Sequence, residues 1–155
     1  IRQLKDSLFA PLGKPGINFK PVLREVQETV FPYDVCIIKS EKSLQTALNR
    51  IEHIREEMLP RVGAGDPHYL MKLIELKGIV FMTEMYLRAS LMRKETRAGH
   101  YREDYPYRDN ENWLKWIVIG QKEGKLNLHA EPVPLVKYKF RPVRYYMDNF
   151  IFPRP

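Results

Sequence analysis

The sequence has only one cysteine among its 155 residues, Cys36, which excludes an internal disulfide and any zinc or iron–sulfur site built from several cysteines. It also lacks an apolar run of the roughly 20 residues that span a bilayer, and its first residues, IRQLKDSLFA, lack the features of a signal peptide. Cys36 lies in the apolar stretch DVCII, which favours a buried, inert thiol. These absences are typical of a protein in a reducing, intracellular setting.

The residue patterns of common chemical sites are missing as well. The four histidines do not pair at metal-ligand spacing, so we expect no metal site. Gly63 and Gly65 neither follow a strand nor precede Gly-Lys-Ser/Thr, so we interpret them as a turn between helices and not as a phosphate-binding loop. No catalytic residue, no cofactor-binding residue and no metal ligand is predicted.

The formal net charge of +7 indicates possible attraction to nucleic acid, because Lys and Arg neutralise phosphates. Most of the basic residues are interleaved with Asp and Glu, however. A clearly basic stretch with interleaved aromatics is confined to the end of the chain, VKYKFRPVRYYMDNFIFPRP. One hypothesis for the function is therefore a freestanding basic module whose aromatic tail binds nucleic acid or an acidic partner.

Hydrophobic periodicity predicts a mainly α fold. Residues 2–10 are a short amphipathic stretch, and apolar residues recur at helical spacing between Asn18 and Pro32, over 41–59 and over 68–93. Short turns make sequential helices antiparallel neighbours. The prediction is an antiparallel helical bundle with three main helices.

Features of the helix ends, and one glycine, refine this bundle. Asn18 and Asp66 are suitable N-caps, and Pro67 fits the first position of a helix. Gly78 lies inside the third helix, where it costs about 1 kcal/mol relative to Ala. We interpret this glycine as the point of a close helix crossing.

The hydrophobic period changes after residue 112. Residues 116–119 are β-branched or aromatic, a polar turn with glycines follows, and apolar residues then alternate over 126–130, which predicts an antiparallel β-hairpin. Repeated prolines predict an extended end. We expect one domain made of a helical bundle with an arginine-rich exit segment (1–112), a β-hairpin (113–132) and an extended, Pro-rich basic tail (133–155).

The segment RKETRAGHYREDYPYRDNENWLKW, residues 93–116, has the highest density of charge. Its arginines and carboxylates can satisfy one another through bidentate bonds. A general acid or base at His100 is conceivable, since a carboxylate such as Asp104 can bring an imidazole pKa to neutral pH. Because no nucleophile, metal site or phosphate loop accompanies it, we favour a polar segment fixed by hydrogen bonds along a domain surface.

This segment resembles the motif RxESRGxHxRxDxPxRDxxxWLKH near the C-terminus of the succinate dehydrogenase and fumarate reductase flavoprotein family, which includes L-aspartate oxidase and, more distantly, the adenylylsulfate reductase alpha subunit. Lys39 stands where that family usually has Arg, and RAGH at 97–100 replaces the commoner RGAH. The similarity covers about residues 1–132. The matching positions are Arg93, Glu95, Arg97, His100, Arg102, Asp104, Pro106, Arg108, Asp109, Trp113, Leu114 and Lys115.

The resemblance implies the C-terminal helical domain of a longer, FAD-dependent oxidoreductase. The flavin-binding and catalytic residues of the family lie N-terminal to this domain, so FAD is implied for the parent and no cofactor or activity for this piece alone. The implied partners are the N-terminal FAD-binding domain of the same chain and an iron–sulfur subunit, without nucleic acid. The implied location is the cytoplasm, with a peripheral place at the inner face of the membrane.

The same resemblance gives the dense segment a role. We expect it to act as a docking seam, the polar stretch by which the domain folds and packs on its neighbour. The chain does not begin with Met and starts inside a predicted helix, so we also expect it to be a piece of a longer polypeptide. The seam residues are Arg93, Glu95, Arg97, His100, Arg102, Asp104, Arg108, Asp109 and Trp113.

Overall fold

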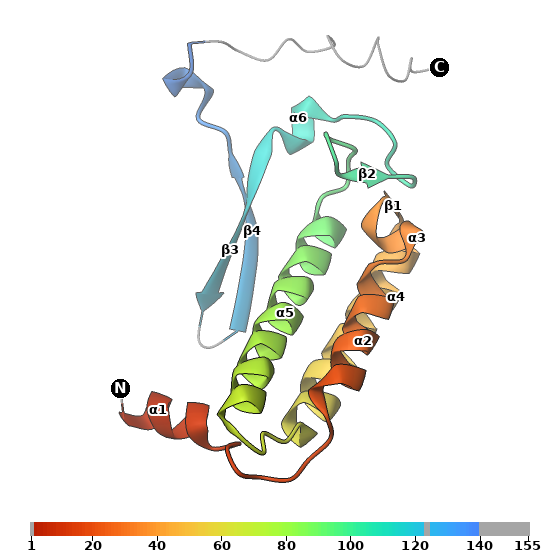
Figure 1. Ribbon diagram of the computed structural model, residues 1–155. Coiled ribbons are helices and arrows are strands. Elements are labelled where there is room, and N and C mark those ends of the chain that lie inside the picture. The colour runs from red at the N-terminus through yellow and green to blue at the C-terminus, as the bar shows by residue number, and fades with distance from the viewer. Residues whose placement is uncertain (1, 123–124, 140–155) are drawn as a thin grey trace.

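Three helices run antiparallel in sequence order, as Figure 1 shows: α2 (Phe19–Val30), α4 (Glu41–His53) and α5 (Pro67–Met92). This computed structural model describes residues 2–122 and 125–139. A short helix, α1 (Arg2–Phe9), projects from the base of the bundle (Figure 1). The prediction of a mainly helical chain is confirmed.

The predicted caps hold the helix starts. The side chain of Asn18 accepts a hydrogen bond from the Lys20 amide at 2.9 Å, and that of Asp66 accepts one from the Tyr69 amide at 2.9 Å. Each bond satisfies one of the amides that a helix leaves without an internal partner at its N-terminus. Pro67 occupies the first position of α5, as predicted.

The second main helix departs from the predicted continuous span of 41–59. Regular α-helix ends at His53, a π-helical turn follows over Ile54–Met58, and a 3-10 turn covers Leu59–Arg61. Pro60 has no amide hydrogen and cannot continue the hydrogen-bond ladder of the helix. Because the π turn carries an extra residue, both Ile54 and Leu59 still face the core.

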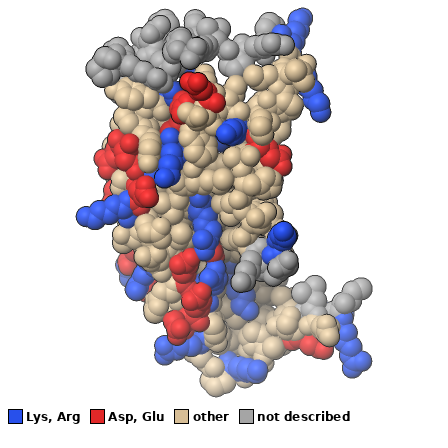
Figure 2. Space-filling view, turned by 180° about the vertical axis from the view of Figure 1, so that it is seen from behind, with Lys and Arg blue, Asp and Glu red and all other residues tan. Residues whose placement is uncertain are grey.

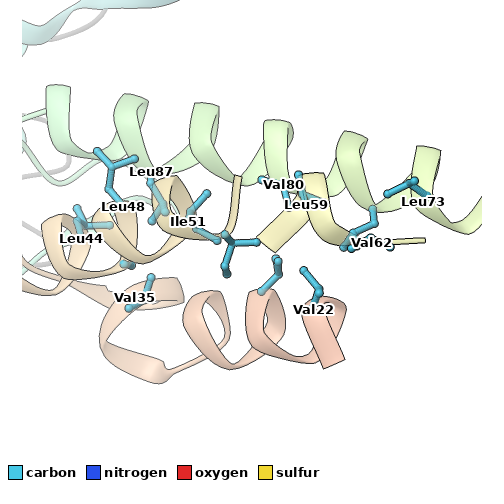
Figure 3. Packing of buried hydrophobic residues seen from close by; sticks show 14 residues of the cluster. Val22, Val35, Leu44, Leu48, Ile51, Leu59, Val62, Leu73, Val80 and Leu87 are labelled. Atoms are coloured by element: carbon cyan, nitrogen blue, oxygen red, sulfur yellow. The ribbon is translucent and has the colours of Figure 1, made fainter. Parts of the chain in front are cut away.

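The core lies between the three helices. In Figure 3, Leu44, Leu48 and Ile51 of α4 point towards apolar side chains of α5, with Val22 and Val35 below them. All of these side chains are buried, as the periodicity of α2 and α4 predicts. Burial of a Val, Leu or Ile side chain contributes about 1.5 to 3 kcal/mol, so this cluster supplies the main driving force for folding.

The crossing predicted at Gly78 is wrong within the described residues. A Cβ built at Gly78 meets no atom within 4 Å, because the residue lies on the exposed side of α5. The close approach occurs at the base of the bundle, where Gly16 and Gly63 meet. There the Ile17 amide donates to the Arg61 carbonyl at 2.8 Å, and the Gly63 amide donates to the Ile17 carbonyl at 3.2 Å.

Several short elements were not predicted. They are α3 (Tyr33–Cys36), β1 (Ile38–Lys39), β2 (Tyr101–Arg102) and α6 (Asn110–Trp113). Strand β1 pairs in parallel with β2, so that Lys39 lies opposite Arg102. Cys36, at the end of α3, is half-buried, and its thiol lies 3.3 Å from the Phe31 carbonyl oxygen.

The predicted hairpin is present as β3 (Lys115–Lys122) and β4 (Lys125–Pro132), which pair antiparallel beside α5 (Figure 1). A 3-10 turn over Leu135–Lys137 follows. The predicted extended tail from residue 140 onward lies outside the described residues. Among the helices at 2–122 and 125–139, none combines the length and apolar character that a membrane crossing requires.

A Gly16→Ala substitution should destabilise the fold by about 1 to 3 kcal/mol, because overpacked atoms force the backbone to shift. A Cβ at residue 16 would lie 2.4 Å from the Gly63 nitrogen, a backbone atom that cannot rotate away. Urea unfolding of the chain measures the change. Gly65→Ala is the matched control, since a Cβ there meets no atom within 4 Å. Equal losses in both variants would contradict the close contact.

Candidate functional site

The docking seam follows the C-terminus of α5 and returns to the top of the bundle (Figure 1). The parallel pairing of β1 with β2 brings it there, and the Glu103 amide extends the pairing by donating to the Lys39 carbonyl at 2.9 Å. The seam therefore lies where α5 ends and α4 begins.

The seam contains two clusters of paired charges. Arg102 is the central side chain of the first cluster, and it is fully buried. Its Nη1 donates to the Ser90 carbonyl oxygen at 2.8 Å, with the carbonyls of Leu91 and Arg93 at 3.4 Å. The last carbonyls of a helix have no partner within the helix and carry the negative end of its dipole. The Arg102 guanidinium thus caps α5.

Asp104 completes this cap at the start of the neighbouring helix. Its Oδ1 and Oδ2 each accept a 2.7 Å bond from Arg102, from Nε and Nη2 respectively, and Oδ2 also accepts from the Glu41 amide at 2.9 Å. Glu41 is the first residue of α4, where a negative charge is favoured by the helix dipole. Hydrogen bonds from Arg102 hold the pKa of Asp104 below its ordinary value. One ion pair therefore joins the end of α5 to the start of α4.

Glu95 is the centre of the second cluster of the seam, and its side chain is also fully buried. It accepts hydrogen bonds from Arg93 at 2.6 Å and from Arg97 at 2.7 and 3.0 Å. It also accepts from the Asp109 amide at 2.9 Å. Two guanidinium groups and one amide compensate the cost of burying this carboxylate.

The arginines around Glu95 extend the network to the hairpin. Arg93 donates to the carbonyls of Trp113, at 3.2 Å, and Lys115, at 2.7 Å, and its guanidinium lies 5.6 Å from the centre of the Trp113 ring. Arg97 donates to Asn110 Oδ1 at 2.7 Å. These contacts fix α6 and the start of β3 to the end of α5.

Arg108 and Asp109 lie directly before α6. Asp109 is the N-cap of this short helix and accepts from the Asn112 amide at 3.0 Å. Arg108 is half-buried in the turns between β2 and α6. All nine predicted seam residues thus lie in one continuous region.

His100 is not placed as a general acid or base beside Asp104. Its Nε2 lies 3.2 Å from the Arg93 carbonyl oxygen, and it closes a tight turn with Arg97, in which Ala98 has a φ of 50°. Burial lowers the pKa of His100, and the positive charges of Lys39, Arg102 and Arg93 lower it further, against an opposing effect of the Arg93 bond. The arrangement favours a neutral, structural imidazole.

Two further buried charged residues, Lys39 near the seam and Glu84 lower in the bundle, were not predicted to be buried. Lys39 is 2% exposed, and among the described residues its Nζ has only the Ile37 carbonyl, at 3.5 Å, as an acceptor. Burial lowers the pKa of this lysine. Glu84 lies on the buried side of α5 and pairs with Arg55 and Arg88. The sequence signal for the burial of Glu84 was its position on the apolar face of the helix, between Val80 and Leu87.

The seam neutralises its own charges. Its guanidinium and carboxylate groups bond to one another and to helix ends, and within residues 2–122 and 125–139 no group of three or more His, Cys, Asp and Glu side chains is placed to hold a metal ion. Chemically, such an arrangement fixes backbone segments and does not offer a reactive group.

Arg102→Ala should cost about 1.5 to 3 kcal/mol of unfolding free energy, because it removes the charged hydrogen bonds of a buried guanidinium to the last carbonyls of α5 and to Asp104. Arg102→Lys should fall between Ala and wild type, since it keeps the charge but lacks the planar fork. Denaturant unfolding measures both variants. In the control Arg24→Ala, which removes an exposed pair with Glu28, the loss should be about 1 kcal/mol or less. A loss at Arg102 no larger than at Arg24 would contradict the cap.

The stability of the domain should fall as the pH drops below about 6.5, the ordinary histidine pKa. A histidine with a lowered folded pKa binds more protons when unfolded, so stability rises with pH across the interval between the folded pKa and the ordinary value. His100→Gln should remove this part of the pH dependence, measured by urea unfolding across that interval. The exposed His68→Gln is the control, and identical profiles for wild type and His100→Gln would refute the assignment.

Comparison with known proteins places these features in a family. The family described as fumarate reductase flavoprotein C-term matches residues 24–146. The match extends beyond residue 132, where the similarity noted in the sequence was expected to end. It includes every residue of the docking seam.

Curated relatives agree. An 8-methylmenaquinol:fumarate reductase flavoprotein subunit of Wolinella succinogenes is 36% identical over 138 residues, which cover 86% of this chain and 22% of that protein. An uncharacterized FAD-dependent oxidoreductase of Methanocaldococcus jannaschii is 32% identical over 110 residues, 71% of this chain and 20% of that protein. An L-aspartate oxidase of Acinetobacter baylyi is 39% identical over 95 residues, 61% of this chain and 16% of that protein. The chain therefore spans about a fifth of the length of these relatives.

Solved structures share the fold. A quinol-fumarate reductase with menaquinol molecules matches with a TM-score of 0.78 at 21% identity, over 91% of this chain and 25% of that one. An E. coli quinol fumarate reductase matches with a TM-score of 0.73 at 22% identity, over 94% of this chain and 25% of that one. The match over residues 24–146 and the relative that is 36% identical over 86% of this chain show that the chain belongs to the C-terminal domain family of the fumarate reductase and succinate dehydrogenase flavoproteins.

Proposed function

We propose that this chain is the C-terminal part of an FAD-dependent oxidoreductase of the fumarate reductase and succinate dehydrogenase type, that it braces the flavin-binding domain of the same polypeptide, and that it docks a partner subunit. Membership of the family is the observation that carries the proposal. The matched relatives include fumarate reductase and succinate dehydrogenase flavoprotein subunits. The parent would then act on fumarate, succinate or a related dicarboxylate.

The glycine turn at the base of the bundle does not fit the phosphates of FAD. A dinucleotide needs free backbone amides in a glycine-rich turn to hold its phosphates. Here the amide of Gly63 donates to the Ile17 carbonyl, and the backbone of Gly16 packs against it. We therefore assign flavin binding and catalysis to the remainder of the parent.

Bracing is supported by the internal pairing of the seam. Arg102 and Asp104 hold α5 to α4, and Glu95 with its arginines holds α5 to α6 and β3. Such cross-links make one rigid block of the bundle and the hairpin base. A rigid block is suited to supporting a neighbouring domain whose reacting groups need fixed positions.

Docking of a partner subunit is supported by an apolar corner between α2 and α3. Phe31, Tyr33 and Ile37 are large and exposed there. A groove of about 770 Å³ between α2, α3 and α4 lies next to them, lined by Asp34, Lys42 and other residues. Exposed aromatic residues beside a concave surface are typical of protein interfaces. An iron–sulfur subunit is the partner that the family resemblance implies.

Family membership separates this proposal from the freestanding basic module. The view in Figure 2 shows Lys and Arg side chains next to Asp and Glu side chains over that face, without a broad region of one sign. A nucleic-acid surface is expected to gather positive charge on one face. The proposed location of the parent is the cytoplasm or the inner face of the membrane.

The chain alone should unfold cooperatively, carry no yellow flavin and fail to reduce fumarate, whereas the complete polypeptide should bind flavin. Removing these 155 residues from the complete polypeptide should lower its flavin content and its unfolding temperature, because the brace is lost. Absorbance spectra and thermal unfolding measure both effects. Tightly bound flavin in the isolated chain, or a truncated polypeptide with unchanged stability, would refute the proposal.

A further inference from the structure

The outer side of α5, opposite the core, is apolar and exposed. Met71 and Met82 are 56% and 62% exposed, and Ile79 and Tyr86 are exposed on the same side at helical spacing. The only charged residues between Gly78 and Met92 are Glu84 and Arg88, which pair with each other and with residues of the α4 segment. We call Met71, Gly78, Ile79, Met82 and Tyr86 the outer face of α5. Glu75 also lies on this side, between Met71 and Ile79, and pairs with Lys72 at 2.9 Å, so the part without charge runs from Gly78 to Tyr86. An apolar surface of this kind marks an interaction site more often than single exposed residues do.

Gly78 lies in the middle of this face, and no contact within the described chain requires a glycine there. Glycine in a helix interior costs about 1 kcal/mol relative to Ala. Its α-carbon is exposed, and no described atom lies within 4 Å of a Cβ placed there. A glycine on a helix surface allows another backbone to approach closely. An atom from outside the described residues would explain the glycine.

Neighbouring elements frame the outer face. In Figure 1, α1 and the hairpin both lie on the side of α5 away from α2 and α4. α1 exposes Leu8 and Phe9, and β3 exposes Trp116. A hollow of about 350 Å³ lies between α5 and β3, lined by Tyr86, Arg93, Trp116 and other residues. The hairpin therefore borders the outer face at its Tyr86 end.

We propose that the outer face of α5 is the seat of the flavin-binding part of the same polypeptide, and that a backbone segment of that part contacts Gly78. This inference rests on the proposed function. The matched relatives are about five times as long as the region they share with this chain, so most of their length is available as the occupant. α1 projects from the base of the bundle on the same side as the hairpin, away from α2 and α4 (Figure 1). A largely apolar surface is typical of a permanent interface.

The test is a substitution whose effect changes sign with context. Gly78→Leu should raise the thermal unfolding midpoint of the isolated chain, because Leu is a better helix former and finds open space. In the complete polypeptide the same substitution should lower flavin content and the temperature of flavin release, because the side chain occupies the place of a backbone. Gln27→Leu, exposed on α2, is the matched control and should leave flavin content unchanged.

A second variant tests the same surface without replacing a glycine, so that a change in helix propensity does not contribute to the result. Met82→Lys should leave the isolated chain folded and lower the flavin-release temperature of the complete polypeptide. Equal stabilisation by Gly78→Leu in both contexts, or no effect of Met82→Lys, would overturn the seat while leaving the proposed function intact. A dimer of the complete polypeptide that Met82→Lys dissolves, with unchanged flavin binding, would assign the face to a second copy and would also overturn it. A wild-type complete polypeptide without flavin would overturn the proposed function itself.

Discussion

The guanidinium group of Arg102 lies between two helix ends of opposite polarity, and the rest of the structure depends on this placement. Carbonyls at the end of α5 face Nη1, the Asp104 carboxylate faces Nε and Nη2, and the first amide of α4 faces that carboxylate. Negative, positive, negative and positive groups therefore alternate along one line of contact. Burial strengthens the bond from Arg102 to the Ser90 carbonyl and makes its loss more costly.

The second cluster of the seam repeats this arrangement with the Glu95 carboxylate at its centre. Glu95 binds two arginines, and these arginines also bind Asn110 and the carbonyls of Trp113 and Lys115. The bundle and the hairpin are thus connected by a polar network and not by a common apolar core. The charged groups of the seam are therefore used in internal contacts.

The regular parts of the fold followed from the sequence because they repeat. The spacing of Leu44, Leu48 and Ile51 specifies which side of α4 is buried, and Asp66 with Pro67 marks the start of α5 by local hydrogen bonding. Two-residue strands such as β1 and β2 have no period to detect, since their pairing joins residues far apart in the chain. The π turn after His53 also leaves the apolar spacing almost unchanged, so the pattern continues through it.

The seam was predictable in composition but not in pairing. Alternating arginines and carboxylates indicated mutual neutralisation, yet only the return of the chain onto β1 determines that Arg102 takes Asp104 and that Glu95 takes Arg93 and Arg97. His100 shows the limit of proximity in sequence: Asp104 is four positions away, but three cations surround the imidazole in space. Gly78 shows another limit, since a glycine inside a helix suggested a close crossing that the described residues do not make.

The hydrogen bond from the Glu41 amide to Asp104 joins residues 63 positions apart, and this separation has a consequence for the order of folding. During synthesis the ribosome releases α2, α4 and α5 before residues 101–104, so the apolar helices can collapse while the top of the bundle is still open. Contacts between distant residues form slowly because a long loop must close first. The contact between Asp104 and the Glu41 amide is therefore expected to form after the three helices have packed against one another.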